Sequence, residues 1–160
     1  AERIEISGNE GRRVDASLIA LDEARDIALL KAEMTGQGII LTSRQAPPVG
    51  LHACAIGNPF GLGHSFSCGV VSATGRKAGF QAIEDFIQTD AAINPGMSGG
   101  ALVDAKGQLI GLINAIYTKE ADIDAGVNFA ISSDLLLKGL ARLSKAFCSQ
   151  TGEGMLTPCP

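Results

Sequence analysis

The sequence has no tryptophan, one tyrosine and only two histidines among its 160 residues. Its Lys and Arg residues form no cluster and the formal net charge is −4, which argues against a nucleic-acid-binding protein. No apolar run approaches the roughly 18 residues that a membrane-spanning helix needs, and the first residues lack the apolar stretch of a signal peptide. The sequence therefore predicts neither a nucleic-acid partner nor a membrane span, in a chain long enough for one domain or two small fused ones.

The four cysteines and two histidines show no metal-binding spacing, so the sequence predicts no metal and no cofactor. Cys54 and Cys68 lie in apolar, strand-like runs, where buried free thiols are common, and the free-thiol interpretation is favoured for both over a disulfide. Cys148 and Cys159 stay undecided, because four cysteines allow three pairings and the sequence does not choose among them.

Twenty glycines and many short apolar runs indicate an all-β protein with tight turns. Strands are expected at 3–7, 14–21, 27–31, 52–56, 66–73, 86–89, 101–103, 109–115 and 127–131. Strands separated by Gly, Asn and Pro turns are typical of barrels or sandwiches. One helix is expected after a Ser or Asp cap at 132–134, with an apolar stripe from Leu135 to Phe147. Residues 149–160 are expected to form a flexible tail.

The segment from Asp90 to Gly100 places one serine on a glycine-rich turn directly after an expected strand. Glycine lets the backbone take positive φ and approach a bound carbonyl closely. The amides of Gly96 and Ser98 can then point at one spot, which is what an oxyanion hole requires. Ser98 is therefore the candidate acyl-transfer nucleophile.

A serine nucleophile needs a base, and neither histidine is in a suitable setting. His52 lies in an apolar strand and is interpreted as a partly buried structural residue. His64 lies in a glycine-rich loop and is expected on the surface. Either histidine could in principle replace the catalytic imidazole, but a base must reach within about 3 Å of the serine hydroxyl, and neither setting favours this.

Five stretches, in order along the chain, resemble the protease domain of the HtrA (DegP/Deg-type) family of trypsin-like serine proteases. They are residues 26–31, 55–63, 69–73, 86–103 and 128–132. The resemblance implies a trypsin-like double β-barrel with a C-terminal helix, in one protease domain over residues 1–148. Residues 1–56 would be a remnant of a first barrel that is incomplete at its N-terminus, and residues 65–148 a second barrel with the helix.

The resemblance also implies roles for residues outside the serine turn. Asp26 would orient the catalytic imidazole, with Asp22 as the competing candidate for that role. The substrate pocket would be lined by Ile93, Asn94, Asn114, Ala115, Ile116 and Tyr117. Apolar side chains in this set favour small or medium aliphatic substrate residues. The loops at 75–85 and 118–125 correspond to regulatory loops of the family.

The chain departs from the family pattern in three ways. The family's catalytic histidine would lie before Ala1, Met97 stands where an asparagine is usual, and no PDZ domain follows the helix. The expected function is a serine endopeptidase that cleaves unfolded or misfolded proteins through an acyl-enzyme at Ser98, in a chain that is itself inactive without its histidine. The alternative is a non-catalytic module that binds extended peptides or acts as a scaffold.

The resemblance implies a location as well. Family members usually work in the bacterial periplasm or elsewhere outside the cytoplasm. Because an incomplete barrel leaves unpaired strand edges, we expect a homo-oligomer or an assembly complemented by another strand.

Overall fold

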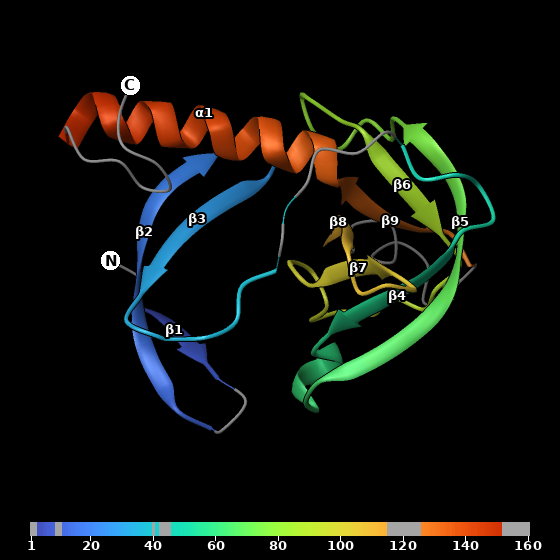
Figure 1. Cartoon of the computed structure of the whole chain (residues 1–160), viewed down its shortest axis with the longest axis horizontal. Helices are drawn as coiled ribbons and strands as arrows, with labels where there is room; N and C mark the ends of the chain where they lie inside the picture. The colour runs from blue at the N-terminus through green and yellow to red at the C-terminus, as the bar shows by residue number, and fades with distance from the viewer. Residues whose placement is uncertain (1–2, 9–10, 40, 42–45, 115–125, 152–160) are drawn as a thin grey trace. The chain divides into compact units, whose positions relative to one another are not determined.

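The computed structural model describes residues 3–8, 11–39, 41, 46–114 and 126–151 (Figure 1). The chain divides into two compact units, one of residues Ala1–Gly38 with Lys138–Pro160 and one of Ile39–Leu137. The first unit holds a sheet and most of a helix, and the second holds a barrel.

The barrel is closed and antiparallel, with the strand order β4-β5-β6-β9-β8-β7. Its strands are β4 (His52–Gly57), β5 (Ser65–Arg76), β6 (Phe86–Thr89), β7 (Ala101–Asp104), β8 (Leu109–Asn114) and β9 (Asn128–Ser132). A short 3-10 turn, Pro59–Gly61, lies between β4 and β5. Pairing of β4 with both β5 and β7 closes the barrel, so every strand has two neighbours.

Small and branched apolar side chains fill the barrel. In β4, Ala53 and Ala55 are fully buried, and these alternate residues point to the interior as strand geometry requires. Their partners in the core come from each of the five remaining barrel strands and from the loop after β6: Val71, Ile87, Ala91, Ile93, Met97, Leu102, Ile110, Ile113 and Ala130. The loop that carries Ser98 thus contributes three side chains to the core.

The N-terminal sheet has the order β1-β2-β3, formed by β1 (Ile4–Ser7), β2 (Arg13–Asp22) and β3 (Ile27–Ala32). A register shift between Leu18 and Ala20 bends β2 against β3. Of the apolar residues in β3, Ile27 is buried, whereas Leu30 is exposed. Strand β3 is therefore only partly buried.

Helix α1 (Ser133–Thr151) begins at a serine cap. The amide of Leu135 donates to Oγ of Ser132, and that hydroxyl donates to the Asp85 carboxylate at 2.6 Å. Gly139 lies against Ile27 of β3, since an added Cβ would come within 2.7 Å of the Ile27 side chain. The helix continues through Thr151, past the predicted tail boundary, and residues 152–160 lie outside the described part. Within the described residues, no helix is long and apolar enough to cross a membrane.

All nine strands expected from the sequence are present, with ends that differ by a few residues. The membership of β4 is different. The predicted boundary at residue 56 assigned this strand to the first barrel, but β4 pairs with β5 and β7 in the closed barrel. An apolar run identifies a strand without naming its partners, which are set by contacts distant in sequence.

Candidate active site

Two consecutive turns carry the serine. The amide of Met97 donates to the carbonyl of Asn94 at 3.0 Å, and Gly96 has φ +95° at the third position of this turn. The amide of Gly100 donates to the carbonyl of Met97 at 2.9 Å, and Gly99 has φ +82° in turn. Positive φ at that position is the mark of a type II turn, which glycine adopts without strain. Ser98 lies at the corner of the second turn and is exposed.

The loop after β4 packs directly under the first turn. A Cβ added to Gly96 would lie 2.6 Å from the carbonyl oxygen of Asn58, and one added to Gly57 would lie 2.9 Å from Cβ of Met97. The amide of Phe60 donates to the carbonyl of Pro95 at 2.8 Å. Because neither glycine has a side chain, the backbone of the loop after β4 packs directly against the serine turn, and this contact fixes the position of the turn.

Side chains at the end of β6 anchor the start of the same loop. Oγ1 of Thr89 donates to the carbonyl of Val70 and accepts from the amide of Ala91. The Asp90 carboxylate accepts from the amide of Val70 at 2.6 Å, over Gly69, where any Cβ would collide with it. These bonds tie the loop to β5 before it reaches the serine.

Strand β8 holds the other side of the serine turn. The amide of Gly99 donates to the carbonyl of Ile113 at 2.9 Å, and the amide of Ile113 donates to the carbonyl of Gly100 at 2.8 Å. Asn114 follows and is buried. The serine turn is therefore held by backbone bonds to β8 as well as by its own turns.

The predicted pocket residues differ in burial, and three of them lie outside the described residues. Ile93 is fully buried within the barrel core, Asn94 is half-buried in the first turn, and Asn114 is buried at the end of β8. Ala115, Ile116 and Tyr117 lie outside the described residues. Met97 is also buried in the core, so its side chain points away from the exposed Ser98 hydroxyl.

The two candidate aspartates lie in the N-terminal unit, at the turn between β2 and β3. Asp22 is buried and paired with Arg25, with Oδ2 2.8 Å from Nη1. Asp26 is exposed and takes φ +56°, a conformation that aspartate tolerates better than most residues. Asp22 is therefore buried in an ion pair, whereas Asp26 is exposed at the surface of this unit.

The two histidines lie on the barrel unit. His52 is exposed, which corrects the prediction of a partly buried residue, because its side chain lies on the outer face of β4. His64 is exposed in the loop before β5, as predicted. His52 begins β4 and Gly57 ends it, so about 16 Å of strand separates His52 from the end that touches Met97.

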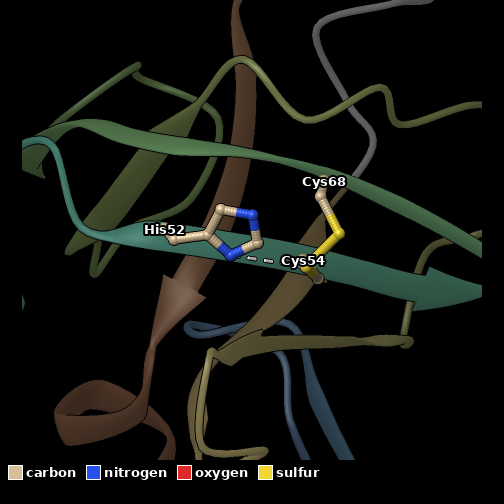
Figure 2. A group of neighbouring side chains, drawn as sticks. All are labelled: His52, Cys54 and Cys68. Atoms are coloured by element: carbon tan, nitrogen blue, oxygen red, sulfur yellow. Dashed lines mark hydrogen bonds between the residues drawn. A yellow bond between two sulfur atoms is a disulfide. The ribbon is translucent and has the colours of Figure 1, made fainter.

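Cys54 and Cys68 form a disulfide, so the prediction of two free thiols was wrong (Figure 2). The register of β4 and β5 places the two residues directly opposite each other, with Cα atoms 4.1 Å apart. Opposed positions of an antiparallel pair bring side chains together. No local sequence signal gives this register.

Glu84 organises the loop between β5 and β6. Its carboxylate accepts hydrogen bonds from the amides of four consecutive residues, 78–81. Desolvation alone would raise the pKa of Glu84, but the four amide bonds favour the charged form and lower the pKa below its usual range. The carboxylate of the neighbouring Asp85 accepts a hydrogen bond from the Ser132 hydroxyl. Glu84 therefore binds backbone amides of the loop, and Asp85 binds the serine that caps α1.

Residues 1–112 match the family model described as the trypsin-like peptidase domain. The chain is 44% identical over 138 residues to "Periplasmic pH-dependent serine endoprotease DegQ" of Escherichia coli K12, a match that covers 84% of this chain and 30% of the relative. It is 43% identical over 137 residues to "Periplasmic serine endoprotease DegP" of the same organism, covering 83% of this chain and 28% of the relative. The chain belongs to the HtrA-type trypsin-like serine proteases.

Solved structures of HtrA-type proteases have the same fold. "HtrA-type protease AlgW with decapeptide" superposes with a TM-score of 0.83 at 43% identity, covering 89% of this chain and 44% of that one. The serine endoprotease from Yersinia pestis gives 0.76 at 37% identity, covering 89% and 49%. The chain spans about 30% of the length of the curated relatives it matches. The predicted family and the predicted β-barrel fold with a C-terminal helix are confirmed.

Proposed function

We propose that this HtrA-type chain carries the nucleophile of a serine endopeptidase. Ser98 attacks the peptide carbonyl, the amides of Gly96 and Ser98 stabilise the oxyanion, and Asp26 orients the imidazole that serves as base. The observation that carries the proposal is the exposed Ser98 at the corner of the second of two consecutive glycine turns, which backbone bonds anchor on both sides. Such rigidity supports preorganised stabilisation of charge.

The chemistry proceeds in two steps. The Ser98 hydroxyl loses its proton to the base as Oγ bonds to the carbonyl carbon, and the peptide amine leaves with a proton. Water then hydrolyses the ester and restores the hydroxyl. His52, on the outer face of β4, does not support a role as that base. We therefore expect these 160 residues alone to turn over substrate about 10⁴- to 10⁶-fold more slowly than a complete triad.

The proposed substrates are unfolded or misfolded proteins, bound as extended segments in a periplasmic or other extracytoplasmic location. The proposed pocket comprises Ile93 and Asn94 before the serine, Asn114 at the end of β8, and Ala115, Ile116 and Tyr117 after that strand. Short aliphatic residues before the scissile bond fit this set. An extended peptide would add a strand along the segment that follows β8.

Association with further copies, or with a complementing strand, is part of the same proposal. Leucines of the N-terminal sheet are exposed in the chain by itself: Leu18 at 51%, Leu21 at 50% and Leu30 at 39%. Exposed apolar side chains on adjacent strands favour a covering partner. Sedimentation of the purified chain as a monomer at all concentrations would contradict this part.

A fluorophosphonate probe tests the nucleophile directly. With added imidazole, intact-mass measurement should show a single adduct, and peptide mapping should place it on Ser98. Ser98→Ala should abolish the adduct, and added imidazole should speed labelling of the parent chain, since it supplies the missing base. Labelling that persists in Ser98→Ala would refute the assignment.

The histidines are separated by the same assay. His52→Ala should label at the parent rate. A loss of labelling confined to His64→Ala would instead identify His64 as the base and overturn the expectation that the chain lacks one.

The alternative function is a non-catalytic module that binds extended peptides. The same barrel and the same segment after β8 would serve it, without acyl transfer. Absence of any adduct with and without imidazole, together with saturable binding of an unfolded peptide by fluorescence anisotropy, would favour this alternative.

A further inference from the structure

A histidine and two cysteines gather on the outer face of the β4–β5 pair (Figure 2). Cys54 and Cys68 are opposed residues, and His52 precedes Cys54 by two positions, so its side chain points to the same face. His52 begins β4 and Cys54 lies in its middle, whereas Gly57, which touches the serine turn, ends the strand. It is therefore separate from the proposed active site.

The spacing of the three side chains suits a metal ion. One ligand atom from each, His nitrogen or cysteine sulfur, lies within 4.8 Å of the other two. Nδ1 of His52 is 3.8 Å from Sγ of Cys54. In a tetrahedral zinc site with ordinary Zn–S and Zn–N bonds, a nitrogen and a sulfur lie about 3.6 Å apart. The histidine thus already lies at nearly the right distance from one sulfur.

The two sulfurs are bonded to each other in the disulfide, whereas two thiolates on one zinc ion lie about 3.8 Å apart. The Cα atoms of this opposed pair are 4.1 Å apart, and rotation about the Cα–Cβ bonds changes the separation of the sulfurs without moving the strands. The strand pair fixes both backbones in either state.

Solvent access is one-sided. Cys54 is 4% exposed and lies beside Val103 of β7, whereas Cys68 and His52 are exposed. A reductant can therefore attack the sulfur of Cys68, and an ion can enter from the same side. The cross-strand neighbour of His52 is Val70, so these two apolar neighbours supply no further ligand and water takes the fourth position.

We propose that reduction of the Cys54–Cys68 disulfide converts this cluster into a site for a thiophilic divalent cation, with Zn²⁺ as the reference ion. A dithiol reductant supplies two electrons and two protons, is itself oxidised to a disulfide, and leaves two thiols. The cation then displaces both thiol protons and binds two thiolates and the neutral His52 imidazole. The oxidised chain lacks thiolates and does not bind. The cluster thus exchanges a covalent cross-link for a metal cross-link between β4 and β5.

The sequence suggested no metal site because the ligands follow no linear zinc motif. His52 and Cys54 are two residues apart, and Cys68 follows 14 residues later. Strand register, and not sequence spacing, brings the third ligand into place.

Zinc titration of the oxidised and reduced chain tests the proposal. Cys148 and Cys159 are replaced by serine so that only the Cys54–Cys68 pair is titrated. A trialkylphosphine reduces the protein and is removed before titration against a chromophoric zinc chelator. The reduced chain should bind one equivalent, and Co²⁺ should give thiolate charge-transfer absorption of a tetrahedral site. Bound zinc should also slow maleimide alkylation of both thiols.

Single variants identify the ligands. His52→Ala keeps the disulfide, so its fold is verified in the oxidised state, and it should bind zinc about 10- to 100-fold more weakly after reduction. Cys68→Ser should lose the cobalt absorption. His64→Ala is the matched control, an exposed histidine outside the cluster, and should bind as the parent does. Equal binding by the oxidised chain, no binding by the reduced chain, or unchanged affinity in His52→Ala would each overturn the proposal.

Discussion

The closed barrel and the three-stranded sheet are both antiparallel, but they bury their side chains differently. In the barrel every strand has two neighbours, and a continuous apolar core fills the interior. In the sheet, Leu18 and Leu21 of the central strand are about half exposed. Closure of a sheet creates an inside, whereas an open sheet by itself leaves both faces to other partners.

The difference extends to the candidate catalytic groups. The loop of Ser98 contributes Ile93 and Met97 to the barrel core, so the packing of these two side chains fixes the position of the loop. Asp26 lies on the turn of the open sheet, where Ile27 is the buried neighbour. A nucleophile anchored by a closed core and an aspartate carried by an open sheet should respond differently to perturbation of their supports.

The largest expected contrast is in core truncation. Leu102 of β7 is fully buried, and Leu102→Ala should lower the free energy of unfolding by about 2–5 kcal/mol through lost contacts and a cavity. Leu18→Ala in β2 removes a side chain that is 51% exposed and should change stability by about 0.5 kcal/mol or less. Urea unfolding followed by circular dichroism measures both. Equal losses would mean that the sheet has a core of its own.

Glycine substitutions sharpen the contrast at the turns. Gly96 and Gly11 both have positive φ, but only Gly96 has backbone within 3 Å of an added Cβ. Gly11→Ala should cost about 1–2 kcal/mol from the left-handed backbone alone, whereas Gly96→Ala adds a collision and should cost about 2–5 kcal/mol. Thermal unfolding compares the two variants. Fluorophosphonate labelling of Ser98 should fall only in Gly96→Ala, and equal labelling of both would disprove a role for the packed turn.

Loss of the Glu84 carboxylate should loosen one loop of the barrel unit. Glu84→Gln retains size but removes the charge that the amides of residues 78–81 bind, so those amides should exchange hydrogen faster by mass spectrometry. Because the pKa of Glu84 is lowered on folding, its stabilisation is complete above the ordinary value of 4.5 and is lost as the pH falls through the lowered pKa. Glu5→Gln in the sheet is the control. A protection factor for the amides of residues 78–81, corrected for intrinsic exchange, that stays constant as the pH falls below 4.5 would contradict the assignment.

Local patterns were enough to predict the strands and the helix. The alternation in β1, the apolar run of β4 and the serine cap at 132 each follow from short-range rules. The glycines at 96 and 99 likewise predicted the turns of the serine loop, because positive φ demands them.

Features that depend on strand register could not be predicted from the sequence. The Cys54–Cys68 pair, the place of β4 in the barrel and the amide contacts of Glu84 all join residues whose neighbours are set by strand pairing or loop closure. The solvent exposure of strand side chains could not be predicted for a related reason. The apolar run of β3 predicts a strand without showing which residues are covered, and the open sheet leaves Leu30 at 39% exposure. Period and propensity identify elements, and only their pairing decides what is covered.

The smallest expected effect is at the surface of the sheet. Nε of Arg3 donates to Asp15 at 2.7 Å, and this hydrogen bond and charge raise the pKa of Arg3. Both side chains are largely exposed, so water and salt screen the pair. Asp15→Asn should leave the thermal midpoint unchanged at physiological ionic strength. Asp22→Asn, which breaks the buried pair with Arg25, should lower the midpoint clearly and is the positive control. A matching drop in Asp15→Asn would show that surface ion pairs hold the open sheet in the way that the core holds the barrel.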